Sequence, residues 1–165
     1  MQGKVVIVTG ASSGIGNAAA TIFAKNGSTV VAVGRNEKEL TALSKSVKKG
    51  VIKPHLADVT ELTQLDRIVS ETMANHGQID VLVNSAGIIK SGSIENTTLD
   101  DWDKMLNVNV RSLFYLMQKC VPHLEETKGN IVNVSSVAGT RSFSKCLVLL
   151  RFKGGGRSAD ALRCT

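Results

Sequence analysis

Three glycines near the amino terminus could hold a phosphate group. Gly10, Gly14 and Gly16 follow residues 4–8, which are rich in β-branched side chains and show no polar alternation, as expected of a strand buried on both faces. An apolar helical pattern begins at residue 18. A glycine-rich turn between such a strand and a helix presents backbone N–H groups and the positive end of the helix dipole. Gly10 permits a tight turn, Gly14 lets a pyrophosphate approach the backbone, and Gly16 allows close helix–strand packing. The stretch therefore predicts a dinucleotide site.

The end of the second predicted strand, residues 29–33, bears on which dinucleotide is bound. In NAD sites an acidic residue usually bonds the ribose hydroxyls at this point. Here Gly34 stands at that position and Arg35 follows. With no carboxylate to repel a 2′-phosphate and a guanidinium beside it, we expect NADP(H) to be favoured over NAD(H). A simpler interpretation of Arg35 is an exposed arginine in a loop.

Polar and small residues also follow the later predicted strands. Asp58 comes after the third strand, where an aspartate could equally cap a turn. Residues 84–87 read Asn-Ser-Ala-Gly after the fourth strand, and small side chains there would let the backbone pass beneath a ligand. Ser135 and Ser136 end the fifth strand, although serines are also ordinary turn formers.

Two asparagines lie inside a long helical pattern that runs from residue 102 to residue 121. Asn107 and Asn109 are poor helix-interior residues, because their amides compete for backbone groups. We therefore expect a kink or a water site at this point of the helix, which should end between Pro122 and Glu126.

These motifs occur in an order and at distances that resemble the short-chain dehydrogenase/reductase family. The resemblance covers residues 1 to about 140 and rests on the spacing Thr9-Gly-x-x-x-Gly-x-Gly16, on Asp58-Val59, on residues 84–87 and on the serine-bearing strand end. One departure is Ser85, which replaces the second asparagine of the family's Asn-Asn-Ala-Gly motif. The family resemblance implies an NAD(P)(H)-dependent oxidation of an alcohol or reduction of a carbonyl, on a small-molecule substrate.

The resemblance also implies roles for particular residues. Ser136 would hydrogen-bond the substrate carbonyl, with Ser135 as its neighbour. Asn109 would hold a proton-relay water, with Asn107 as the second candidate. Asn84 would pin the central sheet and contribute to the cofactor site. The cofactor-binding residues implied are Gly10, Ser12, Ser13, Gly14, Ile15, Gly16, Arg35, Asn36, Asp58, Val59, Asn84, Ala86 and Gly87.

The resemblance breaks at the catalytic pair. The family uses a tyrosine, whose phenol exchanges the proton, and a lysine four residues later. The family's spacing from Ser136 places Leu149 at the tyrosine position and Lys153 at the lysine position, before three glycines. Allowed codons for residues 149–160, read one base out of register, encode Tyr-Cys-Val-Ser-Lys-Ala-Ala-Val-Asp-Gln. We interpret the chain from about residue 149 as a truncated or frame-shifted continuation and expect no measurable turnover.

Strands and helices that alternate along the chain predict how these residues are positioned. Alternation implies parallel crossovers and a doubly wound, Rossmann-type α/β sheet in the order 3-2-1-4-5, with the switch point between strands one and four. Pro54 would place the third strand at an edge of the sheet. We expect a single dinucleotide-binding domain over residues 1–140 and an aberrant tail over residues 141–165, with the later strands missing. The missing helix should leave an apolar face at Leu113, Leu116 and Met117 uncovered.

Composition and charge narrow the function classes. The net charge of +6 is concentrated in residues 141–165, which carry +5 against +1 for residues 1–140, so the basic excess lies outside the predicted domain. We therefore expect no nucleic-acid partner. No apolar run is long enough to span a membrane, and the start lacks a signal pattern, so we expect a cytoplasmic protein without a membrane partner. The three cysteines show no metal-ligand spacing, which predicts free thiols and no metal.

Two alternatives to an active reductase remain at this stage. One is a catalytically dead nucleotide-binding or interaction protein, which would bind the cofactor without turnover. The other is an S-adenosylmethionine methyltransferase, which shares a glycine-rich first turn but usually has an acidic residue where Gly34 stands. By resemblance, the parent protein, meaning the intact family member with an unshifted reading frame, is expected to be a homo-oligomer. The oligomeric state of the present chain is left open.

Overall fold

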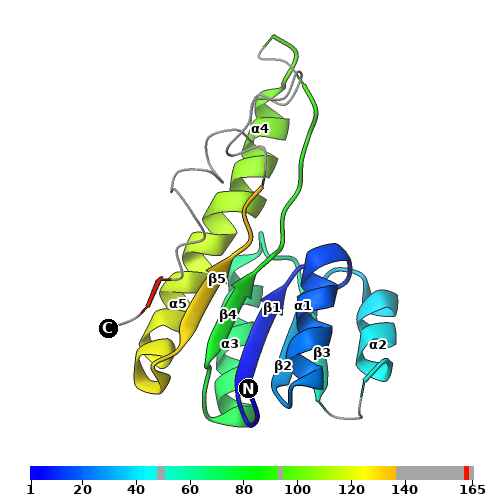
Figure 1. Cartoon of the computed structure of the whole chain (residues 1–165). Coiled ribbons are helices and arrows are strands. Elements are labelled where there is room, and N and C mark those ends of the chain that lie inside the picture. Colours follow the sequence, from blue (N-terminus) through cyan, green and yellow to red (C-terminus); the bar gives the residue numbers. More distant parts are fainter. Residues whose placement is uncertain (48–50, 93–94, 137–161, 164–165) are drawn as a thin grey trace.

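A parallel sheet forms the centre of the molecule (Figure 1). The structure is a computed structural model that describes residues 1–47, 51–92, 95–136 and 162–163. Each strand of the parallel part pairs in register with its neighbour, so the predicted order β3-β2-β1-β4-β5 is confirmed, with β3 at one edge. The five strands are β1 (Val5–Thr9), β2 (Thr29–Gly34), β3 (Ile52–Leu56), β4 (Val81–Asn84) and β5 (Asn130–Asn133).

A sixth strand extends the sheet beyond β5. The two-residue strand β6 (Leu162–Arg163) runs antiparallel to β5, with Ile131 opposite Leu162. No strand was predicted in the tail, because a segment of two residues is too short to show strand periodicity. The rest of the predicted tail lies outside the described residues.

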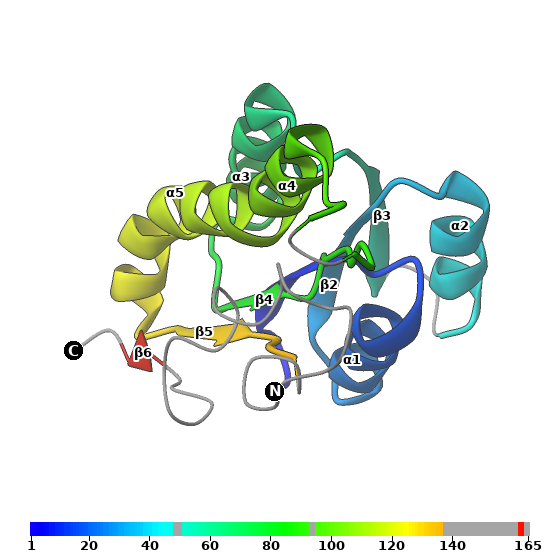
Figure 2. The ribbon, with the colours of Figure 1, turned by 90° about the horizontal axis from the view of Figure 1, so that it is seen from above.

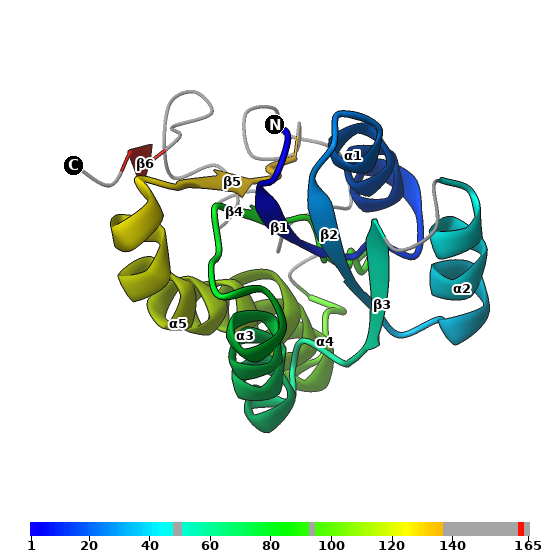
Figure 3. The same cartoon turned by 90° about the horizontal axis from the view of Figure 1, so that it is seen from below.

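Helices cover both faces of the sheet (Figures 2 and 3). One face is covered by α1 and α2, which pack against apolar side chains of β1, β2 and β3. The opposite face is covered by α3 and α5, whose side chains join those of β1, β4 and β5 in a second apolar cluster. The helices are α1 (Gly14–Lys25), α2 (Glu37–Lys45), α3 (Leu62–His76), α4 (Leu99–Leu106) and α5 (Ser112–Thr127).

The expectation of an uncovered apolar face on α5 was wrong for Leu116 and Met117, while Leu113 is half-buried. Leu116 is 1% exposed and belongs to the core between α5 and the sheet, and Met117 packs against the same core. Leu116, Cys120 and Leu124 follow the spacing of one helix face, and this face points at the sheet. The exposed apolar residue of this helix is Phe114, which is 61% exposed.

The long helical pattern is interrupted where the asparagines occur. Between α4 and α5 the backbone forms a π-helical turn, η1 (Asn107–Arg111). The sequence predicted a kink or a water site at the asparagines, and the structure shows a widened turn within a continuous helix. The expected end between Pro122 and Glu126 was too early, since α5 contains Pro122 and continues to Thr127. The hydroxyl of Thr127 donates to the Ile79 carbonyl at 2.8 Å and anchors this last turn beside β4.

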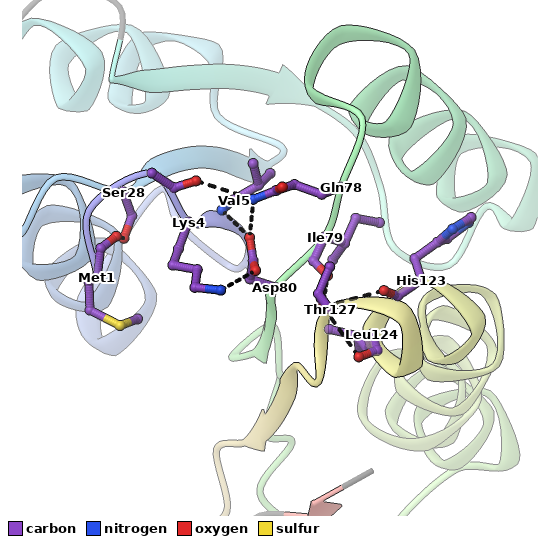
Figure 4. Close-up of polar contacts among 11 residues, drawn as sticks. Met1, Lys4, Val5, Ser28, Gln78, Ile79, Asp80, His123, Leu124 and Thr127 are labelled. Atoms are coloured by element: carbon purple, nitrogen blue, oxygen red, sulfur yellow. Dashed lines mark hydrogen bonds and ion pairs between the residues drawn. The ribbon is translucent and has the colours of Figure 1, made fainter. Parts of the chain in front are cut away.

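A buried carboxylate ties the amino ends of β1 and β4 together (Figure 4). Asp80 is 3% exposed and accepts hydrogen bonds from the Val5 N–H at 2.8 Å, the Lys4 ammonium at 2.8 Å and the Gln78 amide at 2.7 Å. The sequence analysis assigned no role to Asp80. The Asp80 hydrogen bonds lie at the amino ends of the strands, whereas the predicted site residues follow the carboxyl ends. These hydrogen bonds therefore stabilise the sheet and take no part in the predicted site.

None of the helices in the described part of the chain is long and apolar enough to cross a membrane.

Candidate cofactor-binding cleft

A cleft of about 430 Å³ opens at the carboxyl ends of the five parallel strands, β1 to β5. Its position is the one expected for a doubly wound sheet, since the crossovers from β1 and β4 leave in opposite directions and separate there. Each segment that follows one of the five parallel strands contributes to its wall. The lining residues are Gly10, Ser12, Ser13, Gly14, Ile15, Gly34, Arg35, Ala57, Asp58, Val59, Ser85, Ala86, Gly87, Ile88, Ile89, Val108, Val134, Ser135 and Ser136.

The glycine turn has three different local requirements. Gly10 has a φ of +67°, and a Cβ placed on it would lie 2.8 Å from the backbone nitrogen of Ala86. Gly14 has a φ of +54°, with nothing within 4 Å of an added Cβ. Gly16 lies inside α1, where a Cβ would overlap the carbonyl oxygen of Gly10. Gly10 and Gly16 therefore permit close backbone packing, whereas Gly14 faces open space beside the cleft.

The first turn of α1 is suited to an anionic group. Ser13 precedes the helix in an extended conformation, and its side chain makes no capping hydrogen bond. The first turn of α1 contains no acidic residue, so no carboxylate opposes the positive end of the helix dipole. Ser12, Ser13 and Gly14 line the cleft here. These features fit the pyrophosphate of a dinucleotide.

The end of β2 places a cation in the cleft. A Cβ added to Gly34 would lie 3.0 Å from the hydroxyl oxygen of Ser12, so a larger residue would crowd the glycine turn. Arg35 is 68% exposed at its side chain and forms an ion pair with Asp58, with Nη1 and Oδ2 at 3.5 Å. Asn36 does not line the cleft. Its side chain caps α2 instead by accepting a hydrogen bond from the Glu39 N–H at 3.2 Å.

Asp58 is held firmly at the end of β3. Its Oδ1 accepts hydrogen bonds from the Thr60 N–H at 2.9 Å and the Thr60 hydroxyl at 2.8 Å. Its backbone N–H donates to the side chain of Gln64 at 2.8 Å. Burial by itself raises the pKa of Asp58, but the Thr60 hydrogen bonds and the Arg35 charge outweigh it and leave the pKa below its ordinary value. Asp58 therefore carries a negative charge at neutral pH.

Hydrogen bonds among β1, β4 and β5 fix the floor of the cleft. Asn84 is 4% exposed, and its amide donates to the Asn133 side chain at 2.9 Å, so it bridges β4 and β5 as expected. The hydroxyl oxygen of Thr9 accepts from the N–H groups of Ser85 and Ala86, each at 3.1 Å. The sequence analysis gave Thr9 no role of its own, although its place in the glycine motif could have indicated one.

The two helix asparagines have different environments. Asn109 is 7% exposed, and its side chain makes two hydrogen bonds with the backbone of Ile88. Its Oδ1 accepts from the Ile88 N–H and its Nδ2 donates to the Ile88 carbonyl, both at 2.9 Å. Ile88 lines the cleft, as does Val108 of η1. Asn109 thus fastens the helix to the cleft wall, and Asn107 lies half-buried beside it.

The proposed catalytic residues are only partly within the described chain. Ser136 and Ser135 line the cleft at the end of β5. Lys153 lies outside the described residues, as does Leu149 at the family's tyrosine position.

A Tyr-x-x-x-Lys spacing that the sequence analysis overlooked occurs in α5. The chain contains one tyrosine, Tyr115, and Lys119 follows it by four residues. The phenol donates to the carboxylate of Asp66 on α3, with oxygen–oxygen distances of 2.9 and 3.0 Å. The Lys119 ammonium pairs with the same carboxylate at 2.9 Å. Neither residue lines the cleft, so this pair joins two helices and does not face the cofactor site.

Comparisons with known proteins agree with this architecture. A family model described as short chain dehydrogenase matches residues 4–148. A 3-oxoacyl-(acyl-carrier-protein) reductase FabG from Thermotoga maritima is 39% identical over 142 residues, which are 84% of this chain and 58% of the relative. An uncharacterized oxidoreductase from Staphylococcus saprophyticus is 37% identical over 143 residues, which are 84% of this chain and 61% of the relative. The chain thus spans about three fifths of the length of these curated relatives.

Solved structures show the same fold. A metagenomic short-chain oxidoreductase in complex with NADP superposes with a TM-score of 0.88 at 30% identity, over 93% of this chain and 72% of that chain. A putative short-chain dehydrogenase/reductase from Burkholderia xenovorans superposes with a TM-score of 0.87 at 32% identity, over 93% of this chain and 62% of that chain.

Proposed function

Because this chain belongs to the short-chain dehydrogenase family of oxidoreductases, we propose that its cleft binds NADP(H) in preference to NAD(H). The glycine turn supports dinucleotide binding, because Gly10 and Gly16 pack backbone against backbone and the first turn of α1 opens on the cleft without an acidic residue. The observation that carries the preference is the end of β2, where Gly34 and the cationic Arg35 line the cleft and no carboxylate stands on that strand end. The metagenomic relative of known structure is described as a complex with NADP.

The residues at the two ends of the cleft would hold different parts of the dinucleotide. The N–H groups at the start of α1 would bind the pyrophosphate. Val59 and Asp58 would lie beside the adenine, and Arg35 would bind the 2′-phosphate that distinguishes NADP(H). Ala86 and Gly87 lack large side chains and would leave room for the nicotinamide half.

The parent activity is proposed to be the oxidation of an alcohol or the reduction of a carbonyl. Bound NADP(H) supplies or accepts the hydride in such a reaction. Ser136, which lines the cleft after the carboxyl end of β5, would donate a hydrogen bond to the carbonyl oxygen of a small-molecule substrate. Asn109 would keep Ile88 and η1 in place and hold the proton-relay water. A homo-oligomer is proposed for the parent protein.

The chain as given is proposed to bind the cofactor without turnover. Its tyrosine is engaged with Asp66 on α3, away from the cleft, and Leu149 stands at the family's tyrosine position. Loss of a positioned general acid typically costs about 10²–10⁴-fold in rate. The favoured explanation of the tail is a frame-shifted continuation, which the coding nucleotides for residues 144–165, read in all three frames, would reveal.

Binding and turnover should be measured on the same preparation. NADPH fluorescence, titrated with the full chain, should show saturable binding, and Arg35→Ala should weaken it while sparing NADH. Arg111→Ala is the matched control, because Arg111 is exposed in η1 and does not line the cleft. Absorbance at the NADPH band should stay constant when a 3-oxoacyl or simple ketone substrate is added. Absence of NADPH binding would refute the cofactor proposal, and carbonyl-dependent NADPH oxidation would refute the proposed inactivity.

A further inference from the structure

We propose that Asp58 acts as an internal competitor for Arg35 and thereby limits how strongly the cleft prefers NADP(H) over NAD(H). This inference rests on the proposed function, since it concerns the same dinucleotide in the same cleft. It assigns a specificity role to a carboxylate for which the sequence alone suggested only cofactor binding or a turn cap.

The geometry makes the carboxylate the fixed partner and the guanidinium the adjustable one. Three hydrogen bonds hold Asp58: two from Thr60 to Oδ1 and one from the Asp58 N–H to Gln64. The Oδ2 that remains lies 3.5 Å from Nη1 of Arg35. The side chain of Arg35 is 68% exposed, against 34% for Asp58. An arriving phosphate therefore has to draw Arg35 into a new position, while Asp58 stays where it is.

The charges in the cleft balance before any ligand arrives. Among the described residues that line it, Arg35 is the one cation and Asp58 the one anion. A phosphate monoester carries about −1.5 to −2 charges at neutral pH. A 2′-phosphate bound by Arg35 would consequently lie near a fixed like charge, and it would also have to replace the existing ion pair. NAD(H) carries an uncharged hydroxyl at this position, so Asp58 repels only the phosphorylated cofactor.

The protonation state of Asp58 supports this role. The Thr60 hydrogen bonds and Arg35 keep its pKa below the ordinary value in spite of partial burial. The repulsion is therefore present at any pH near neutrality.

The test is the ratio of two dissociation constants, Kd(NADH) to Kd(NADPH), measured by fluorescence titration at low salt. Asp58→Asn keeps an Oδ1 that can accept from Thr60 but removes the charge, and it should raise the ratio by about 3- to 10-fold. The increase should be smaller when the same change is made in an Arg35→Gln background, because the competition for Arg35 is then gone and only the direct repulsion of the phosphate remains. It should also shrink as salt is added. Asp103→Asn is the matched control, since Asp103 is exposed on α4 and does not line the cleft, and it should leave the ratio unchanged.

The ratio cancels any effect that both cofactors share. If Asp58→Asn weakens both cofactors equally, or raises the ratio as much without Arg35, the inference is wrong and Asp58 serves only the shared adenine or the turn. If the unmodified chain binds neither cofactor, the proposed function itself fails. Thermal unfolding verifies that each variant is folded, and Asp58→Ser, which also offers Thr60 an acceptor oxygen, provides a second uncharged variant should Asp58→Asn not fold.

Discussion

At the scale of single residues, Gly14 and Gly16 show that neighbouring glycines serve different purposes. Gly14 has a positive φ with free space around it, whereas an added Cβ on Gly16 would overlap a carbonyl oxygen of the preceding turn. We expect Gly16→Ala to lower the free energy of unfolding by about 2–3 kcal/mol, as for an overpacked core, and to abolish NADPH binding. Gly14→Ala should cost about 1 kcal/mol for its left-handed backbone. Chemical denaturation of both variants measures the difference; equal losses would contradict this assignment.

Asp80 is the residue whose loss should damage the scaffold most directly. It is 3% exposed and accepts three hydrogen bonds, one of them from the backbone of β1. We expect Asp80→Ala to lower the free energy of unfolding by about 3 kcal/mol, because the Val5 N–H would be left buried without an acceptor. Lys4→Met is the control and should cost about 1 kcal/mol or less, since the Lys4 side chain is 47% exposed. Urea denaturation measures the free energy of unfolding of both variants. A larger loss in Lys4→Met than in Asp80→Ala would contradict the role given to Asp80.

At the scale of elements, strands and helices were predicted best where a single physical property of the residues determines the local structure. Runs rich in β-branched residues predicted β1 and β2. Pro54 correctly indicated an edge strand, because proline cannot donate in a central ladder. The asparagines indicated a disturbed helix, but the sequence could not say that it would be a π-helical turn. The two hydrogen bonds between Asn109 in this turn and Ile88 join residues 21 apart in the chain, so no local sequence pattern reveals them.

The π-helical turn should depend on Asn109 and not on Asn107. Asn109→Ala removes both side-chain hydrogen bonds to Ile88 and should lower the free energy of unfolding by about 2 kcal/mol. In Asn109→Ala, amide exchange at residues 88–89 and 107–111 should accelerate together, because the variant lacks the hydrogen bonds that join the two segments. Asn107→Ala is the matched control and should change amide exchange little. Equal acceleration in both variants would show that the turn is set by the backbone and not by Asn109.

The packing of β3 on α3 should make stability depend on pH. His55 lies half-buried beside Glu71, with Nδ1 and Oε2 at 3.5 Å. Burial lowers the pKa of His55 below 6.5 and outweighs the opposing charge of Glu71, while Arg67 lowers it further. The unfolded chain therefore takes up this proton at a higher pH than the folded chain, so stability should fall as the pH falls through 6.5.

Urea denaturation at pH 7.5 and 5.5 measures this effect. The loss of stability between these values should be smaller in His55→Gln than in the unmodified chain. His123→Gln controls for the removal of a histidine elsewhere, on α5, and should retain the full loss. The same pH dependence in all three proteins would exclude His55 as its source.

At the scale of the whole molecule, the candidate site could be predicted because most of its residues come directly after a parallel strand in the sequence. Parallel strands bring their carboxyl ends to one edge, so motifs far apart in the chain meet there, and eleven of the sixteen proposed site residues line the cleft. Gly16, Asn84 and Asn109 instead support it from within the structure, and Asn36 caps α2. The Asp80 network and the Tyr115–Asp66 contact could not be foreseen, because each joins residues about 50 or more positions apart.

NADP(H) binding at the carboxyl ends of the strands is best tested by amide hydrogen exchange of the full chain, detected by mass spectrometry with and without saturating NADPH. We expect slower exchange in residues 10–16, 34–35, 57–59 and 84–89, and unchanged exchange at the opposite end of the sheet, in residues 78–80 and 124–127. Such a pattern would support NADP(H) binding at the carboxyl ends of the strands. Protection that is absent from the glycine turn, or confined to other parts of the chain, would contradict it.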